Sequence, residues 1–385
     1  MKIIDVKAYP VSIPLVPPVS PYGLSRTEVT ASSTLIVEVD TDESIVGWGE
    51  TRILFSAKVD EFMIREYFKP ILINKDPFNV EKLVKSFQYR GLHHRANSMI
   101  AGIEMALWDI MGKDVNKPLY KLLGGKLREK IPIAACMGIR RAKEAAETAA
   151  EYANQGFSTI KTKGGRSISD DVARVKAIRK AVGGDVEIRL DANQAYSPGS
   201  AMRLIKKVEK YDLQYFEQPC RWDSLEEMAK LRASTETPIA LNESVTDARS
   251  MLNIVEAKAA DFCLPDMPDA GGIIGVKKIA AVAEAAGIPL IMHCFFEKGI
   301  KTAASLHVVS STPIFNLAND STIYGHKDYI LKEPFKVLDG CIEVPEGPGL
   351  GIEVDGEKLK KYSTPIERVV GIKGKPEWQL VPPVL

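Results

Sequence analysis

Three acidic residues, Asp191, Glu217 and Glu243, each follow a short apolar segment of the chain. If these segments are neighbouring strands, the carboxylates lie side by side and repel one another unless they are protonated or neutralised. A hard divalent cation with oxygen ligands neutralises such a cluster, and Mg²⁺ keeps positions open for a further carboxylate. A single acidic strand end usually forms a salt bridge with a nearby helix, but three in succession favour a magnesium site. Asn193 would lie on the metal side as a hydrogen-bond donor.

Two lysines, Lys161 and Lys163, end another β-branched and apolar segment just before a glycine pair. Because the side chains of a strand alternate, both lysines must point to the same face. On a solvent-facing strand such a pair has no special role, and this is the common case. Opposite the carboxylates, however, Lys161 can hold developing negative charge. Lys163 can act as a base, since a lysine beside a metal and a second lysine can have a lowered pKa.

Asp266 and His293 end two further apolar segments. A carboxylate that accepts a hydrogen bond from one ring nitrogen fixes the histidine tautomer and leaves the other nitrogen for acid or base chemistry. A lone histidine is usually structural, but this one comes one strand after an aspartate. These groups together predict a site that removes a proton next to a carboxylate. The metal and Lys161 would hold the enediolate charge, with Lys163 and His293 on opposite faces.

The spacing of these residues indicates the fold that must position them. Successive strand ends lie about 23 to 28 residues apart, which fits one strand, one helix and two short loops. Helical patterns fill the intervals, for example over residues 170–182, 224–233 and 273–286. This alternation predicts a parallel sheet that closes at about eight units into a (β/α)7-8 TIM-like α/β barrel, with its chemistry at the carboxyl ends of the strands.

The first third of the chain has a different pattern, in which strands come first and helices follow. The strands are predicted over residues 3–13, 34–39 and 45–50, the last two as a hairpin, and the helices over residues 59–68, 80–89 and 97–112. We therefore expect an α+β capping domain over residues 1–125, the barrel over 126–330, and a C-terminal segment, 331–385, that packs back on the capping domain and completes it.

A polar, proline-rich loop over residues 16–29 separates the first two strands. Such a loop is either a disordered surface or a lid, and lids over barrel mouths exclude water and select substrate. As a lid it would bring Tyr22 or Arg26 to the distal end of the substrate. The adjacent His93 and His94, followed by Arg95, favour a surface or helix-cap role, because two neighbouring side chains cannot both face one way on regular structure.

The composition excludes several classes of protein. The 385 residues include 51 basic and 50 acidic side chains, a net charge of +1, which gives no electrostatic case for binding nucleic acid or a membrane. Five cysteines without a Cys-x-x-Cys pair argue against a disulfide framework or a thiolate zinc site. The chain starts as a strand and has no run of membrane-spanning length. We expect a soluble cytoplasmic protein, acting on a small-molecule carboxylate and forming a homo-oligomer.

The residues above stand within longer motifs. These are Gly47-Trp48-Gly49-Glu50, Ala106-Leu107-Trp108-Asp109, Lys161-Thr162-Lys163, Asp191-Ala192-Asn193, Phe216-Glu217-Gln218-Pro219, Glu243-Ser244, Pro265-Asp266 with Gly271-Gly272, and His293. In this set the chain resembles the enolase superfamily, specifically its mandelate racemase/muconate-lactonising group, over essentially the whole length. The resemblance implies the same three metal ligands and base chemistry at Lys163, with Lys161 holding the substrate carboxylate. It also implies a second acid or base at His293, oriented by Asp266.

The sixth strand directs the choice of subgroup within this resemblance. Cycloisomerases and dipeptide epimerases carry a catalytic lysine there, whereas this chain has Asp266 followed by the histidine, like the mandelate racemase subgroup. Most known members of that subgroup are acid-sugar dehydratases, and a few are racemases. The racemase pattern also has a glutamate after strand eight. Here Asn316, Asn319 and Asp320 stand in that stretch; we expect Asn319 to donate a hydrogen bond to substrate and leave the other two unassigned.

The sequence thus favours a magnesium-dependent hydro-lyase that dehydrates a sugar acid to a 2-keto-3-deoxy acid through an enediolate. A racemase or epimerase of a 2-hydroxy acid or related carboxylate, using the same two bases without a leaving group, is the alternative. A non-catalytic binding protein is a remote third, because it would not need the full set of residues.

Overall fold

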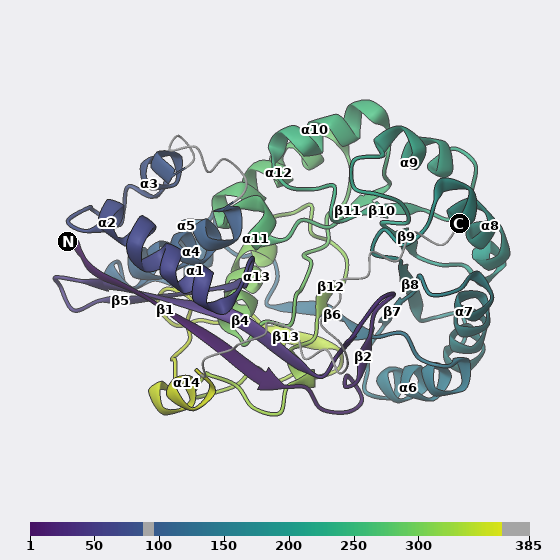
Figure 1. The fold of residues 1–385 in the computed structure, drawn as a ribbon, viewed down its shortest axis with the longest axis horizontal. Coiled ribbons are helices and arrows are strands. Elements are labelled where there is room, and N and C mark those ends of the chain that lie inside the picture. Colours follow the sequence, from purple (N-terminus) through teal and green to yellow (C-terminus); the bar gives the residue numbers. More distant parts are fainter. Residues whose placement is uncertain (88–95, 364–385) are drawn as a thin grey trace.

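The computed structural model describes residues 1–87 and 96–363, which form a barrel with a smaller domain packed against one side (Figure 1). The residues His93, His94 and Arg95, and the end of the helix predicted over 80–89, lie outside the described residues. Within the described part, every helix is too short or too polar to cross a bilayer.

The smaller domain is built on an antiparallel sheet in the order β1 (Ile3–Pro14), β4 (Ala31–Thr41), β5 (Val46–Arg52). The predicted hairpin is confirmed, because Asp40 pairs with Val46 across the turn. The long helix α4 (Asn97–Asp114) lies on this sheet. A Cβ at Gly49 would lie 1.8 Å from the Gly102 carbonyl oxygen, so only glycine allows the helix to approach this closely.

The helix predicted over residues 59–68 is divided in the structure. It starts as α1 (Ala57–Met63), passes through a π-helical turn over Ile64–Phe68, and continues as α2 (Lys69–Leu72). Pro70 in the first turn of α2 has no N–H to donate to the carbonyl four residues earlier, and the Lys69 N–H reaches back five residues to Ile64. The proline thus explains why one regular helix does not form. Two further helices of this domain are α3 (Val80–Phe87) and α5 (Leu119–Leu122).

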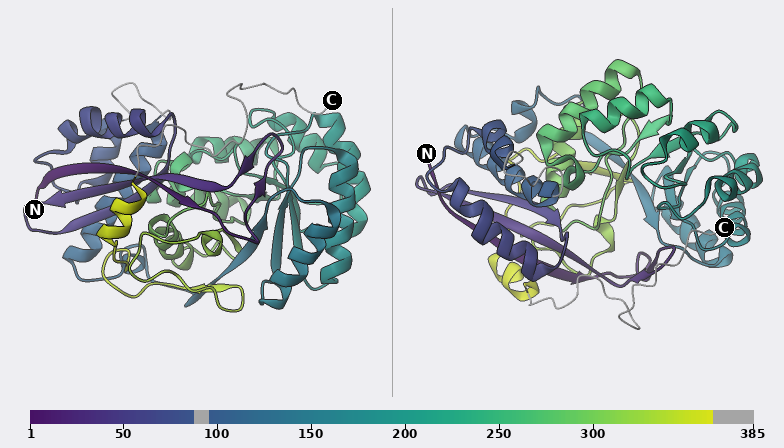
Figure 2. Two further views of the ribbon diagram at one scale, coloured as in Figure 1. Left: turned by 60° about the horizontal axis from the view of Figure 1, so that its bottom comes forward. Right: turned by 45° about the horizontal axis from the view of Figure 1, so that its top comes forward.

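The barrel sheet is parallel and curled, as Figure 2 shows. Its strands are β6 (Lys130–Met137), β7 (Thr159–Lys163), β8 (Glu187–Asp191), β9 (Tyr215–Glu217), β10 (Ile239–Leu241), β11 (Phe262–Cys263) and β12 (Asn319–Ser321). β12 pairs with β6, and a single bridge at Leu290 takes the place of the strand expected before His293. The Asp320 N–H donates to the Met292 carbonyl at 3.0 Å and closes the ring on that side. The predicted barrel is therefore confirmed.

Helices follow the strands and form the outer layer. They are α6 (Ala142–Asn154), α7 (Ile168–Val182), α8 (Pro198–Val208), α9 (Leu225–Arg232), α10 (Ala248–Ala257), α11 (Met267–Ala270), α12 (Ile273–Ala286) and α13 (Ile300–Ser310). Capping side chains determine where several of these helices begin. The Ser167 and Ser197 hydroxyls accept hydrogen bonds from N–H groups in the first turns of α7 and α8, and Asp247 forms a capping box at α10.

Two glutamates of the smaller domain cap helices of the barrel. Glu50 accepts hydrogen bonds from the N–H groups of Lys298 at 2.6 Å and Lys301 at 3.0 Å, where α13 begins. Glu104 on α4 accepts from the first two residues of α12 at 2.8 and 3.0 Å. A helix N-terminus favours negative charge, so these two carboxylates fix the capping domain on the barrel.

The described part of the C-terminal segment touches both domains. Strand β13 (Cys341–Glu343) pairs antiparallel with β6, at the amino-terminal end of the barrel. Farther on, the Leu350 N–H donates to Asp109 on α4 at 2.8 Å, and α14 (Gly356–Tyr362) contacts β1. The chain thus packs on the capping domain after first adding a strand to the barrel sheet. The boundaries at residues 125 and 330 stay predictions.

Candidate active site

The strand register brings the chemically active residues together. Lys163 at the end of β7 pairs with Asp191 at the end of β8, which in turn pairs with Glu217 at the end of β9. All five residues of β7 are buried, so the solvent-facing alternative for the two lysines is excluded. Asn193 follows β8 with φ +43°, a left-handed conformation that asparagine tolerates, and its amide turns back towards the same site.

Three carboxylates surround the Lys161 ammonium. Its Nζ is 2.6 Å from Glu217 Oε2, 2.7 Å from Asp320 Oδ2 and 3.2 Å from Asp191 Oδ2. Burial opposes the charged form of Lys161, but the surrounding carboxylates outweigh it and raise its pKa well above the ordinary value. Lys161 is therefore a fixed positive charge at the centre of the site.

Lys163 is the neighbouring cation. Its Nζ lies 2.5 Å from Asp191 Oδ2 and 2.9 Å from the side-chain oxygen of Asn193. Burial disfavours the charge, yet the contact with Asp191 raises the pKa of Lys163 overall. This direction reflects the aspartate bound to the lysine itself, and the lowered pKa expected for Lys163 beside a metal stays a prediction.

The carboxylates carry the features of a cation site. Burial and then the nearby charge of Asp191 raise the pKa of Glu217 well above its usual value, so negative charge is crowded here. Glu243 Oε1 accepts from Asn193 at 3.3 Å, whereas its Oε2 is buried without a hydrogen-bond partner. An oxygen-rich set with an unsatisfied carboxylate oxygen fits a hard cation such as Mg²⁺.

One detail differs from the predicted ligand set. Among the described residues, the possible ligands whose atoms all lie within 4.8 Å of one another are Asp191, Glu217 and His293. Glu243, in the loop after β10, is outside this group. The geometry thus places a ring nitrogen of the histidine close to the first two carboxylates.

The predicted histidine–aspartate pair is formed. His293 Nδ1 lies 3.1 Å from Asp266 Oδ2, and the aspartate is fully buried while the imidazole is partly exposed. Burial alone would raise the pKa of Asp266, but the Lys301 ammonium beside it and the histidine lower the pKa well below its usual range. The ionised carboxylate accepts from Nδ1–H, and Nε2 is the ring nitrogen left for chemistry.

Three charged residues of the site carried no role in the sequence interpretation. Asp320 binds Lys161 on one oxygen, and its other oxygen is 3.2 Å from Arg189. Arg189 lies two residues before Asp191 on β8, so strand alternation could have placed it on the inner face. Lys301 enters the barrel from α13 and forms an ion pair with Asp266. No spacing in the sequence predicts this ion pair.

Asn319 lies where the barrel closes. Its side-chain oxygen accepts from the Met292 N–H at 2.7 Å, and its NH₂ group donates to the Leu317 carbonyl at 3.2 Å. Both ends of the buried amide thus satisfy main-chain groups where the barrel closes. Asn319 therefore has a structural role, and the expectation that it also binds substrate stays a prediction.

The predicted lid, residues 16–29, is docked at the barrel mouth. It contains a small hairpin of β2 (Tyr22–Gly23) and β3 (Glu28–Val29), beside the ends of β6 and β7 (Figure 1). The Gly23 carbonyl accepts from the Ile139 N–H at 2.7 Å, and a side chain at Gly23 would collide with Ile139. The Tyr22 ring is buried and meets Phe296 edge-on at 4.8 Å, whereas Arg26 is exposed.

Comparisons with known proteins agree with this architecture. Residues 6–124 match the N-terminal domain model of mandelate racemase and muconate lactonizing enzyme, and residues 144–359 match the enolase C-terminal domain-like model. Together the two models cover both domains.

Relatives of this family align along most of the chain. N-succinyl-L-Arg/Lys racemase of Bacillus cereus is 29% identical over 94% of this chain and 98% of the relative, and its crystal structure matches with a TM-score of 0.89. Arabinonate dehydratase of Saccharolobus solfataricus is 33% identical over 84% of this chain and 89% of the relative. L-Ala-D/L-Glu epimerase of Bacillus subtilis is 33% identical over 91% of this chain and 97% of the relative. This chain therefore belongs to the mandelate racemase/muconate-lactonising group of the enolase superfamily.

Proposed function

We propose that this chain is a magnesium-dependent lyase that dehydrates a sugar acid to a 2-keto-3-deoxy acid. The observation that carries the proposal is that a lysine and a histidine both lie close to Asp191. Lys163 Nζ is 2.5 Å from this aspartate, and His293 offers a ring nitrogen within 4.8 Å of it. A base and an acid around one charged centre are what an elimination next to a carboxylate requires.

Each residue has a distinct task in this reaction. Lys161 holds the substrate carboxylate and the negative charge that moves onto it. Lys163, as the free amine, takes the proton from the alpha carbon, and the electron pair of that C–H bond forms the enediolate. His293 then protonates the hydroxyl on the beta carbon, which leaves as water. The resulting enol releases its hydroxyl proton, takes up a proton at the beta carbon and becomes the 2-keto-3-deoxy acid.

The metal would be held by Asp191, Glu217 and Glu243. When bound, Mg²⁺ supplies positive charge that stabilises the enediolate. The crowded charge at Glu217 and the partnerless oxygen of Glu243 support this ligand set.

Removal of divalent metal is expected to abolish turnover, and Glu217→Gln is expected to weaken Mg²⁺ binding by at least about 100-fold, measured by calorimetry. The apo variant should keep or gain thermal stability, because neutralising one carboxylate relieves repulsion among the others. Glu226→Gln, an exposed position on α9, is the matched control. Full turnover after exhaustive chelation would contradict the metal requirement, and unchanged affinity would show that the ligand set is wrong.

A racemase or epimerase is the second candidate. The racemase of Bacillus cereus, with a TM-score of 0.89, supports it, and a lysine and a histidine on opposite faces could exchange a proton without a leaving group.

A panel of sugar acids, 2-hydroxy acids and N-acyl amino acids in deuterated buffer tests the proposal. A dehydratase releases a 2-keto product, whereas a racemase gives deuterated substrate of inverted configuration. Binding without either reaction would support the remote alternative of a non-catalytic binding protein.

Replacement of the lid residue Arg26 by alanine is expected to raise KM about tenfold, with kcat and metal affinity nearly unchanged, because it would contact the distal end of the substrate. Glu28→Ala, also exposed on the same hairpin, is the control. Equal KM values for the two variants on every accepted substrate would show that the loop is ordinary protein surface and not a lid that contacts substrate.

A further inference from the structure

We propose that Lys301 is a positioning residue for the second acid–base group, holding both His293 and its partner Asp266. This inference rests on the proposed function, since it assigns a task within the same site. Lys301 was given no role by its sequence position, and it lies on α13 rather than at a strand end.

The Lys301 ammonium contacts the pair at two separate points. It donates a hydrogen bond to the main-chain carbonyl of His293 at 2.5 Å, and it forms an ion pair with Asp266 Oδ1 at 2.9 Å. The other oxygen of that carboxylate faces His293 Nδ1. One ammonium therefore fixes the backbone that carries the imidazole and also the carboxylate that sets the ring orientation.

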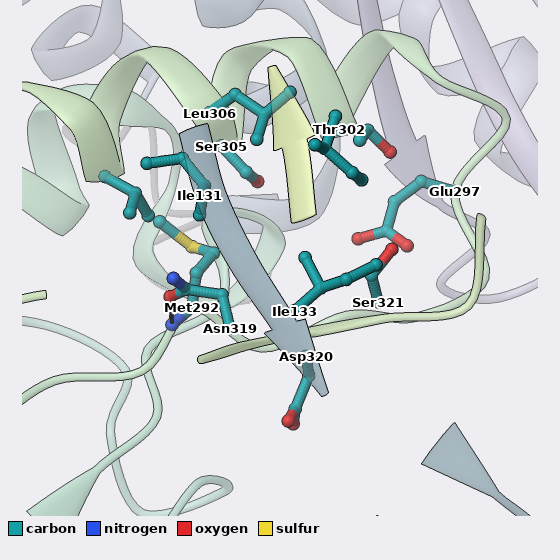
Figure 3. Close-up of a pocket in the computed structure, with 12 residues that line it drawn as sticks. Ile131, Ile133, Met292, Glu297, Thr302, Ser305, Leu306, Asn319, Asp320 and Ser321 are labelled. Carbon is teal, nitrogen blue, oxygen red and sulfur yellow. Dashed lines mark hydrogen bonds between the residues drawn. The ribbon is translucent and has the colours of Figure 1, made fainter. Parts of the chain in front are cut away.

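A third contact fixes the ammonium itself. Glu297, one turn earlier, accepts from Lys301 Nζ at 2.7 Å. Figure 3 shows the Glu297 carboxylate pointing into a cavity of about 30 Å³, which has room for little more than one water molecule. Because Lys301 is fully buried, bulk solvent cannot take over its contacts.

The main chain of Lys301 is held from the other domain. Glu50 on β5 accepts from its N–H at 3.0 Å, and Gly299 just before it has φ +118°, a conformation open to glycine. The capping domain thus sets where α13 begins, and the start of α13 places the ammonium against the histidine–aspartate pair.

Lys301→Met tests the proposal, since it keeps an unbranched side chain of similar size and removes its charge. Two rates are measured in the metal-loaded full chain: elimination, which needs His293, and alpha-proton exchange, which needs Lys163. We expect elimination to fall about 10- to 100-fold and exchange to stay within about threefold. The matched control is Lys298→Met, an equally buried lysine whose ammonium contacts Ser32 and the Phe296 carbonyl instead; its ratio of elimination to exchange should equal that of the wild type.

The outcomes that overturn the proposal are specific. An equal fall of both rates in Lys301→Met means a general structural role, and an unchanged ratio means no role. If Lys301→Met does not fold, Glu297→Gln replaces it, because it removes the charge that holds the ammonium while keeping the shape. A wild-type ratio of elimination to exchange in Glu297→Gln then contradicts the proposal.

A spectroscopic readout separates this proposal from the proposed function. In histidine-labelled protein, the Nδ1–H proton bound to Asp266 is identified by its absence in His293→Asn. Lys301→Met should shift or broaden that resonance, whereas Lys298→Met should not. If no substrate of the panel reacts, the proposed function fails while this test still decides the role of Lys301. An unmoved resonance in Lys301→Met overturns the inference.

Discussion

Lys163→Ala is expected to lower both alpha-proton exchange and elimination by about 10²- to 10⁴-fold, the usual contribution of a general base. The physical reason is position: Lys163 ends β7 with its amine at Asp191, and no other amine of the described residues shares that contact except Lys161. Lys161 cannot replace it, because three carboxylates hold it in the charged form. Exchange is followed by the incorporation of deuterium into recovered substrate.

The alanine variant must be shown to keep its metal site. Removing an ammonium that lies against Asp191 leaves the carboxylates less neutralised, so Mg²⁺ affinity should be retained or increased. Lys176→Ala, on the exposed side of α7, controls for the loss of a lysine. Exchange that persists in Lys163→Ala but disappears in His293→Asn would reverse the two roles, and the reactive substrate would then have the opposite configuration at its alpha carbon.

The parts of this molecule that follow local rules were predictable. Alternation on β7 placed Lys161 and Lys163 on one buried face, and the regular spacing of Asp191 and Glu217 gave the parallel sheet. These inferences need only the period of a strand and the length of a βα unit. The fold and the lysine–carboxylate neighbourhood therefore follow from residues that are close in sequence or repeat regularly.

Contacts that depend on barrel closure were not predictable. Arg189 and Asp320 are 131 residues apart, and they meet only because β12 returns to pair with β6. The two main-chain contacts of the Asn319 amide depend on the irregular stretch before it, where a full strand did not form. Lys301 depends on the exact turn at Gly299 and on Glu50 from the other domain. Such positions are set by tertiary packing, which a pattern in one segment does not contain.

His293→Asn is expected to lower elimination by about 10²- to 10⁴-fold while slow alpha-proton exchange continues. Asparagine can still donate a hydrogen bond, but it cannot transfer a proton to a departing hydroxyl. The base Lys163 and the charge of Lys161 remain, so the enediolate forms and returns to substrate. The measurement follows the 2-keto product and the deuterium content of recovered substrate in the same reaction.

The same variant also discriminates between the two candidate reactions. In a dehydratase, His293→Asn retains proton exchange for the substrate whose alpha proton faces Lys163. The 2-keto product is lost. In a racemase the variant retains exchange of one enantiomer and loses interconversion, because the proposed second base has been removed. Asp266→Asn should reproduce the defect more weakly, since the imidazole stays in place but loses the carboxylate 3.1 Å from Nδ1 that orients it. Loss of exchange together with elimination in His293→Asn would show that the histidine takes part in enediolate formation, and the division of labour proposed for the two faces would be wrong.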